Sequence, residues 1–328
     1  MTRLTNKWIS LLAIVLLAGV FTGCTQKKQN VSQNGKVHLN IAIQPVPGYA
    51  PLYLLQDKGW LEEALKEKNV KVTFTEFESG PPENESFVAG QQDIGVMGNV
   101  PAIAGIAAGQ NRSIIGISYN GEKTEATLVE ADSKISSVTD LKGKKVGLVI
   151  GSIAQNLLSE QLKQAGLSLS DVELVNLSPG ELGAALENHQ VDAVSVWDPT
   201  ITKLKTKQNA RVLADGTGVF LGENAIVADK DYVKENPDVV KVFFQQYERA
   251  VKEIEDNSSN FAKEYADKFG LSQEELEQVL ANIHFQIAIE KKDGEELQRT
   301  ADFLYEEGIL SKKLSVEEYI DYDIAKGE

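Results

Sequence analysis

The chain has 328 residues, of which 33 are basic and 48 acidic, so its formal net charge is −15. This acidic balance argues against nucleic-acid binding and against polybasic contact with anionic lipid, because both partners would repel the chain. The length exceeds what one small hydrophobic core requires and predicts two domains.

The N-terminal residues are typical of a secretory signal. Arg3 and Lys7 precede an apolar run at 9–21. A transmembrane anchor is the alternative, but a spanning helix needs roughly 18 or more apolar residues and this run is shorter. We therefore expect a signal peptide at 1–23.

Cys24 is the only cysteine and follows the small residues that end the apolar run, so an internal disulfide is excluded. The sequence LLAGVFTGC at 16–24 resembles a lipobox, with Phe21 in place of the usual leucine. We expect cleavage before Cys24 and acylation of its thiol. Residues 24–36 are polar and unpatterned and predict a flexible tether.

From residue 37 onward short apolar runs alternate with helical patterns. The first series predicts strands at 38–44, 70–77, 93–98 and 112–120, and helices at 50–68, 82–90 and 100–109. The second series predicts strands at 127–130, 144–150, 172–178 and 191–197, with helices after residue 152 and at 179–190. This alternation predicts mostly parallel sheets with right-handed crossovers, and two successive series predict two α/β domains.

The last third of the chain changes to helical patterns after one more predicted strand at 225–233. Amphipathic helices are predicted within 238–257, 259–270, 272–283 and 293–308. Ser272 and Glu275 fit a capping box, and Gly270 and Gly308 fit helix ends. We expect these acidic helices to pack on a domain rather than bind a membrane.

Six strand-to-helix turns are rich in Gly, Pro, Ser, Asn and Gln. They lie at 44–51, 78–84, 97–102, 118–125, 150–156 and 196–200. In open parallel sheets, ligands bind outside the carboxyl ends of the strands, where such turns meet. Their backbone N–H groups and helix N-termini can hold an anion without a cationic side chain, and the turn at 150–156 has no Lys, Arg or His.

Residues that could catalyse a reaction are few. The three histidines, His38, His189 and His284, lack metal-ligand spacing, and no nucleophile-elbow, zinc-protease or Walker pattern occurs. Asp198 is placed to cap the helix that follows it. Several aromatic residues border the turns and could wall a pocket: Tyr49, Tyr119, Trp197 and Phe285.

Several motifs together resemble one known family. IAIQ with a Pro/Gly-rich turn, FESGP, DIGVMGNVPA, DLKGKKVG, GSIAQNLL, VDAVSVWDP and TADFLYEEGIL follow the lipobox in this order. The chain resembles the solute-binding lipoproteins of ABC importers, in the aliphatic sulfonate, taurine and nitrate group. The likeness covers nearly the whole chain after the signal.

The resemblance implies an α/β chain with the type II periplasmic-binding-protein fold, in which two lobes enclose a hinged cleft. Lobe 1 would comprise 37–122 and 220–328, and lobe 2 would comprise 123–219. It also implies a monomeric receptor without cofactor or metal, anchored by its lipid at the outer face of the cell membrane. The closed, loaded form would dock on an ABC permease that a separate ATPase drives.

The resemblance and the turns together give a set of candidate ligand contacts. They are Gln44, Gly48, Tyr49, Gly80, Pro81, Asn99, Val100, Tyr119, Gly151, Ser152, Ile153, Ala154, Gln155, Asn156, Trp197 and Asp198. The chain departs from the family at Ser152-Ile153-Ala154, where sulfonate binders would carry two or three hydroxyl residues and only Ser152 offers one.

The ligand is left open among several classes. A sulfonate such as taurine leads, and nitrate, a thiamine-pyrimidine precursor or a flavin are alternatives, the last two because Tyr49, Tyr119 or Trp197 could stack on a ring. An enzyme on the same fold would have to depend on His284. A lipid-tethered adhesion module is disfavoured, because the sequence contains no repeat array.

Overall fold

The computed structural model describes residues 37–207 and 209–326. The predicted signal peptide at 1–23, the lipidated Cys24 and the tether at 24–36 lie outside these residues. Within the described part of the chain, no helix has the length and apolar character needed to cross a membrane.

The first lobe, called lobe 1, is built on a six-stranded sheet with the order β11-β4-β10-β3-β1-β2. Its strands are β1 (Val37–Ile43), β2 (Val70–Glu76), β3 (Ile94–Gly98), β4 (Arg112–Asn120), β10 (Asn224–Asp229) and β11 (His284–Phe285). β1 pairs in parallel with β2 and β3, whereas β10 runs antiparallel to both β3 and β4.

The second lobe, called lobe 2, is built on a five-stranded sheet with the order β7-β6-β8-β5-β9. Its strands are β5 (Glu125–Glu130), β6 (Lys145–Leu148), β7 (Glu173–Asn176), β8 (Ala193–Trp197) and β9 (Ala210–Asp215). β6 pairs in parallel with β7 and β8, and β5 runs antiparallel to β8 and β9. The strands that enter each lobe from the other, β5 and β10, thus run antiparallel to both of their neighbours, and β11 is antiparallel to β4.

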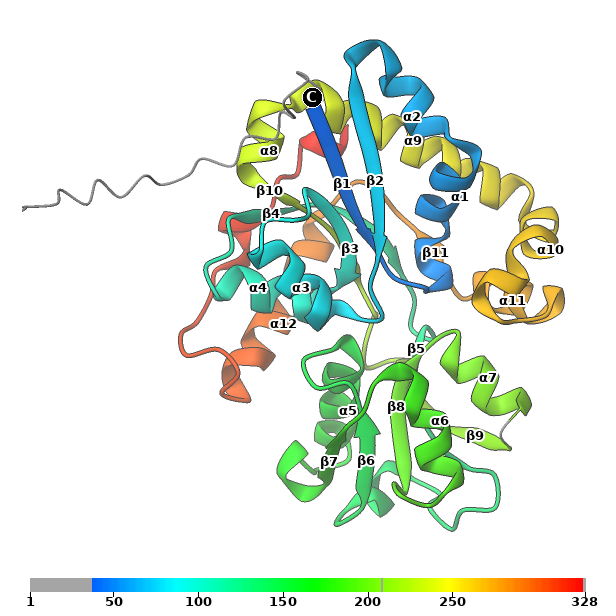
Figure 1. The fold of residues 1–328 in the computed structure, drawn as a ribbon. Coiled ribbons are helices and arrows are strands. Elements are labelled where there is room, and N and C mark those ends of the chain that lie inside the picture. The colour runs from blue at the N-terminus through cyan, green and yellow to red at the C-terminus, as the bar shows by residue number, and fades with distance from the viewer. Residues whose placement is uncertain (1–36, 208, 327–328) are drawn as a thin grey trace, which may run out of the picture.

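Two chain segments connect the lobes, at 121–124 and at 216–223. Figure 1 shows lobe 2, in green, joined to lobe 1 by these connections close to the start of β5. The predicted lobe boundaries, between 122 and 123 and between 219 and 220, fall inside these connections and stay predictions.

Helices flank both sheets. In lobe 1 they are α1 (Ala50–Lys58), α2 (Trp60–Leu65), α3 (Gly80–Val88), α4 (Asn99–Ala107), α8 (Lys230–Glu235), α9 (Pro237–Asp256), α10 (Ser258–Phe269), α11 (Gln273–Leu280) and α12 (Lys291–Glu306). In lobe 2 they are α5 (Ile153–Gln164), α6 (Pro179–Glu187) and α7 (Thr200–Lys207).

The structure corrects the sequence prediction at three elements. The single helix predicted at 50–68 is divided at Gly59, whose left-handed backbone (φ +64°) ends α1 and precedes α2. The predicted strand at 225–233 ends at Asp229, which caps α8 by accepting a hydrogen bond from the Tyr232 N–H. No strand was predicted at 210–215, where the structure has β9. The helix expected after Asp198 is α7, and the Thr202 N–H donates to Asp198 Oδ1 at 3.0 Å.

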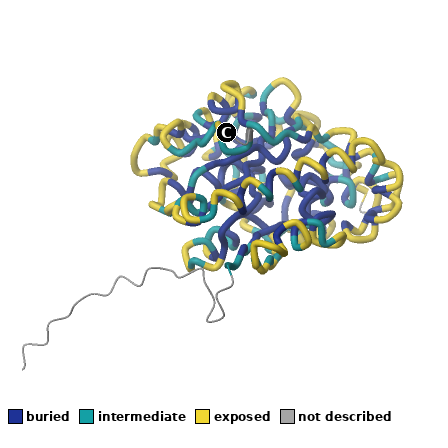
Figure 2. The backbone as a smooth tube through the Cα atoms, turned by 90° about the horizontal axis from the view of Figure 1, so that it is seen from above, coloured by how far each residue is buried: buried dark blue, intermediate teal, exposed yellow. Residues whose placement is uncertain are grey.

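Buried residues gather in the interior of the molecule, and exposed residues lie at its periphery (Figure 2). The α9 helix shows how a lobe 1 helix packs. Phe243, Phe244 and Tyr247 are buried, and their rings meet at centroid distances of 5.4 and 5.7 Å. These aromatic contacts stabilise the packing of α9 in lobe 1, which carries most of the predicted turns.

Candidate ligand-binding site

A small cavity lies where the two lobes meet. Its volume is about 20 Å³, and its walls come from both lobes. The lining residues are Gln44, Val46, Tyr49, Gly80, Gly98, Pro101, Tyr119, Glu125, Ser152, Ile153, Trp197 and Asn224. A space of this size holds about one water molecule, so a ligand of several heavy atoms requires the lobes to move apart.

Three helix N-termini point toward this cavity. The first residue of α3, Gly80, lines it, as do the first residue of α5, Ile153, and the residue that precedes α4, Gly98. Because the N–H groups of a first helical turn have no partner inside the helix, each end carries partial positive charge. The three ends together favour an anion in the cavity.

Ser152 precedes α5 and places a hydroxyl at the cavity. Its side chain is 3% exposed, and its Oγ lacks a hydrogen-bond partner. Gly151 adopts a left-handed backbone (φ +78°), and its N–H donates to the Gln155 side chain at 2.8 Å. The turn thereby holds the Ser152 hydroxyl and the first N–H groups of α5 toward the same space.

An aromatic pair forms the lobe 1 wall of the cavity. The rings of Tyr49 and Tyr119 meet edge to face with centroids 5.4 Å apart, and the Tyr49 hydroxyl donates to Oδ1 of Asn224. Gly48 lies directly against the Tyr119 ring, where an added Cβ would come within 2.1 Å of a ring carbon. Trp197, on lobe 2, is 7% exposed and lines the cavity from the other lobe.

Gln44 is held in one orientation beneath the cavity. Its Nε2 donates to Glu83 Oε2 at 2.7 Å and to the Val96 carbonyl at 3.2 Å. A carbonyl can only accept, so the amide nitrogen must face Val96. The Oε1 atom is therefore the part of this amide that can meet a ligand.

Three buried glutamates lie at or near the site, and burial raises the pKa of each. The pKa of Glu83 rises to about 8, and the nearby Arg112 partly offsets that rise. The pKa of Glu125 also rises to about 8, and Thr124 limits its rise by donating a hydrogen bond. The pKa of Glu223 rises to about 9, with Asp293 adding to the effect of burial.

These raised pKa values predict that the protein loses stability as the pH rises from about 5 to 9. The folded state keeps protons on Glu83 and Glu223 that the unfolded chain releases above about pH 4.5, and Glu125 adds to this effect only while the cleft is closed. Each group lowers the unfolding free energy by up to about 1.4 kcal/mol per pH unit until its own folded-state pKa is passed. Urea unfolding at pH 5.5, 7 and 8.5 measures this fall.

Glu223→Gln isolates one of these contributions, because its side chain cannot ionise. We expect its unfolding free energy to fall less steeply between pH 5.5 and 8.5 than that of the wild type. An unfolding free energy that stays constant or rises across this range would contradict protonated glutamates in the folded protein.

The predicted contact residues divide into three groups. Seven line the cavity: Gln44, Tyr49, Gly80, Tyr119, Ser152, Ile153 and Trp197. Seven lie beside it in the same turns without lining it: Gly48, Pro81, Asn99, Val100, Gly151, Ala154 and Gln155. The last two line neighbouring pockets, Asn156 one of about 270 Å³ and Asp198 one of about 130 Å³. Ligand contact by any of them stays a prediction.

Val46, Gly98 and Pro101, in two of the predicted turns, line the cavity but were not among the predicted contacts. Nor were Glu125, the last residue of the predicted turn at 118–125, and Asn224. Both lie where the chain enters a lobe, Glu125 at the start of β5 and Asn224 at the start of β10. Charged or amide residues within a few positions of the two predicted lobe boundaries were the available signal. His284 is exposed on β11 and is absent from the cavity lining.

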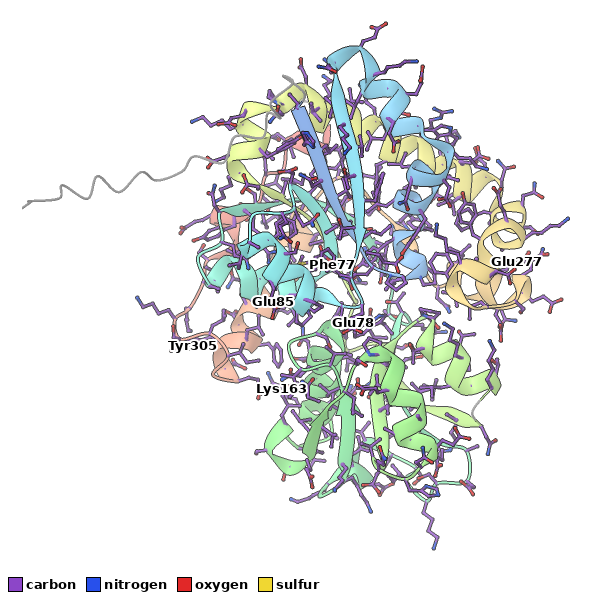
Figure 3. The ribbon with its side chains drawn as sticks, in the orientation of Figure 1. Phe77, Glu78, Glu85, Lys163, Glu277 and Tyr305 are labelled. Carbon is purple, nitrogen blue, oxygen red and sulfur yellow. The ribbon has the colours of Figure 1, made fainter. Side chains whose placement is uncertain are left out.

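The lobes also contact each other on both sides of the cavity. On one side, Lys163 of α5 pairs with Glu306 of α12 at 3.7 Å. Figure 3 labels Lys163 and Tyr305 where these helices approach. On the other side, Lys207 of α7 donates to the Gly270 carbonyl at 2.9 Å. The described residues contain no group of three or more His, Cys, Asp or Glu side chains arranged to hold a metal ion.

Comparison with known proteins places the chain in a family. The model of the family described as NMT1/THI5 like matches residues 46–260. A Bacillus subtilis (strain 168) protein named as an aliphatic sulfonates-binding protein is 34% identical over 318 residues, which cover 95% of each chain.

Two solved structures share the fold over most of their length. The alkanesulfonate-binding protein SsuA from Xanthomonas axonopodis pv. citri, bound to MOPS, superposes with a TM-score of 0.80, 29% identity, and coverage of 87% of this chain and 98% of that one. The periplasmic aliphatic sulphonate binding protein SsuA from Escherichia coli gives a TM-score of 0.77, 27% identity, and coverage of 88% and 99%. The chain therefore belongs to the NMT1/THI5-like family and has the periplasmic-binding-protein fold that the sequence predicted.

Proposed function

We propose that this protein is the extracytoplasmic substrate-binding component of an ABC importer and that it binds a small aliphatic sulfonate between its lobes. The observation that carries the proposal is the set of donors at the cavity. The buried Ser152 hydroxyl lacks a partner, and three helix N-termini surround the same space. Such a site suits a monoanion, because backbone and hydroxyl donors can hold its oxygens without a cationic side chain.

The relatives support the same ligand class, since the Bacillus subtilis protein and the two SsuA proteins are named for binding aliphatic sulfonates or alkanesulfonates. A receptor also fits the chemistry of the cavity better than an enzyme does. No histidine, lysine or cysteine is among its lining residues, so Ser152 has no base of these types beside it to activate it as a nucleophile.

The cellular role follows from the predicted N-terminus. We propose a monomer that is tethered through an acylated Cys24 at the outer face of the cell membrane. Ligand binding holds the two lobes together, and the closed form delivers the ligand to a membrane permease that a separate ATPase drives. The difference between open and closed forms must then be only a few kcal/mol, so that ligand contacts decide which one dominates.

Calorimetric titration of residues 25–328 tests the ligand class. We expect ethanesulfonate or taurine to bind with one site per chain, and nitrate, a thiamine pyrimidine and riboflavin to bind more weakly or not at all. Binding of the pyrimidine or the flavin alone would overturn the sulfonate assignment and favour stacking on Tyr49, Tyr119 or Trp197.

Ser152→Ala should weaken sulfonate binding by about 10- to 100-fold, which corresponds to the loss of one hydrogen bond to a charged group. The free energy of unfolding should stay constant or rise, because the Ser152 hydroxyl has no partner to lose. Titration calorimetry and urea unfolding of the same variant measure the two quantities.

Ser178→Ala is the matched control. Ser178 also precedes a lobe 2 helix, α6, but its hydroxyl bonds to Glu181 at 2.7 Å in a capping box away from the cavity. This variant should lose about 1 kcal/mol of stability and keep its sulfonate affinity. Equal sulfonate affinities of the two variants would exclude Ser152 as a hydrogen-bond donor to the bound anion.

A further inference from the structure

A buried carboxyl group lies at the base of the cavity, where both connections between the lobes meet. Glu125 is the first residue of β5 and is 1% exposed. Its Oε2 accepts a hydrogen bond from Thr124 Oγ1 at 2.8 Å, whereas its Oε1 is buried without a partner. On the return connection, a Cβ added to Gly222 would lie 2.4 Å from Oε2. The carboxyl is thus fixed in place, with one oxygen left for a ligand.

The groups that face this carboxyl are neutral or acidic. Tyr49 and Tyr119 face it from lobe 1, and Asp198 faces it from the end of β8. The residues that line the cavity include no lysine, arginine or histidine. Glu83, on the far side of Gln44, and Glu223, next to Asn224, are further buried carboxyls close to the cavity. An ionised Glu125 would therefore lie beside a bound anion with no positive side chain to separate the two charges.

We propose that Glu125 is a specificity-determining residue, which takes up a proton when the anion binds and donates its O–H to the bound anion. This inference rests on the proposed function, because it takes a sulfonate as the anion. The carboxylate gains one proton from solvent, and the sulfonate keeps its charge and accepts the new hydrogen bond. Binding of one anion thus consumes up to one proton.

Closure of the lobes supplies the physical cause. In the proposed open form, Tyr49 and Tyr119 of lobe 1 would lie away from Glu125 and water would reach its carboxyl, where a glutamate pKa is about 4.3. In the closed cleft, burial raises the pKa of this group to about 8. Proton uptake therefore occurs between about pH 5 and 8, and anion affinity falls by up to about tenfold per pH unit across that range.

The opposite role for Glu125 gives a different result. An ionised carboxylate would accept hydrogen bonds from the ammonium group of an aminosulfonate such as taurine. The ligand would then favour the charged carboxylate, and binding would consume no proton. Ethanesulfonate has no amine and does not titrate in this pH range, so comparison of it with taurine distinguishes the two roles.

The test is titration of ethanesulfonate into residues 25–328 between pH 5.5 and 8, at each pH in two buffers that differ in ionisation enthalpy. The wild type should bind about tenfold more weakly for each pH unit and should take up close to one proton per ligand near pH 6.5. Glu125→Gln should show no pH dependence, because its amide donates at every pH, and should bind at least tenfold more tightly than the wild type at pH 8.

Glu130→Gln is the matched control. Glu130 is at the other end of β5 and pairs with His189 at 3.0 Å, outside the cavity. This variant should keep the pH dependence and the proton uptake of the wild type.

Three results would overturn the role of Glu125. The first is a wild-type affinity for ethanesulfonate that does not vary with pH, and the second is a pH dependence that persists in Glu125→Gln. The third is that Glu125→Gln binds no sulfonate at any pH while the wild type binds taurine without proton uptake. If no sulfonate binds the wild type at any pH, the proposed function itself fails, so the two failures are distinguishable.

Discussion

Gly98→Leu should weaken sulfonate binding by about 100-fold or more. Gly98 ends β3 and lines the cavity, and an added Cβ would lie 2.9 Å from the Ile153 Cβ on the opposite lobe. The rest of a leucine side chain would occupy the ligand space and hold the lobes apart. Its backbone φ of −56° suits any residue, so lobe 1 should fold normally. Titration calorimetry measures the affinity, and thermal unfolding confirms the fold.

Gly180→Leu provides the control for this variant. Gly180 lies in α6 of lobe 2, where an added Cβ meets no atom within 4 Å. We expect wild-type affinity from this protein. If Gly98→Leu also keeps wild-type affinity, the ligand does not bind in a cleft that closes between Gly98 and Ile153.

Arg112→Met should lower the free energy of unfolding by about 3 kcal/mol. The substitution removes a buried guanidinium and leaves the buried polar groups around it without their cationic hydrogen-bond donor. Arg112 is 1% exposed, and its Nη2 donates to the carbonyls of Pro101 and Ala102 at 2.7 Å each. Its guanidinium also faces Glu83 and lies 5.4 Å from the centre of the Phe87 ring. Since Pro101 lines the cavity, the variant should also bind sulfonate more weakly.

The comparison for this prediction is Arg249→Met. Arg249 is exposed on α9, where its guanidinium stacks 3.6 Å from the centre of the Trp60 ring. An exposed cation–π contact contributes about 0.5–1 kcal/mol, so urea unfolding should show a much smaller loss. Equal losses for the two arginine variants would exclude a structural role for the buried guanidinium beneath α4.

The sequence was sufficient to predict the fold class, because strand and helix periods alternate twice along the chain. Pattern alone does not give strand direction, so the antiparallel courses of β5 and β10 were not anticipated. The division of the predicted helix at Gly59 also depends on a backbone conformation that a single glycine permits but does not require.

The candidate site could be predicted in part from the order of strands and turns along the chain. Turns that follow parallel strands gather at one sheet edge, so Gln44 and Ser152 could be selected from their positions. Glu125 and Asn224 come to the cavity by long-range pairing. The Tyr49 hydroxyl meets the side chain of Asn224 across 175 positions of sequence. Local pattern contains no information about such a contact.

The proposed function requires that an anion binds between the lobes at the N-terminus of α5. A crystal structure of residues 25–328 with 2-bromoethanesulfonate tests it most directly, because anomalous scattering from bromine locates the ligand independently of the density. We expect a sulfonate oxygen within hydrogen-bond distance of Ser152 Oγ and of the Ile153 N–H, with both lobes enclosing the ligand. A ligand located only in the pocket beside Arg299 and Asn156, or only on the outer surface, would contradict it.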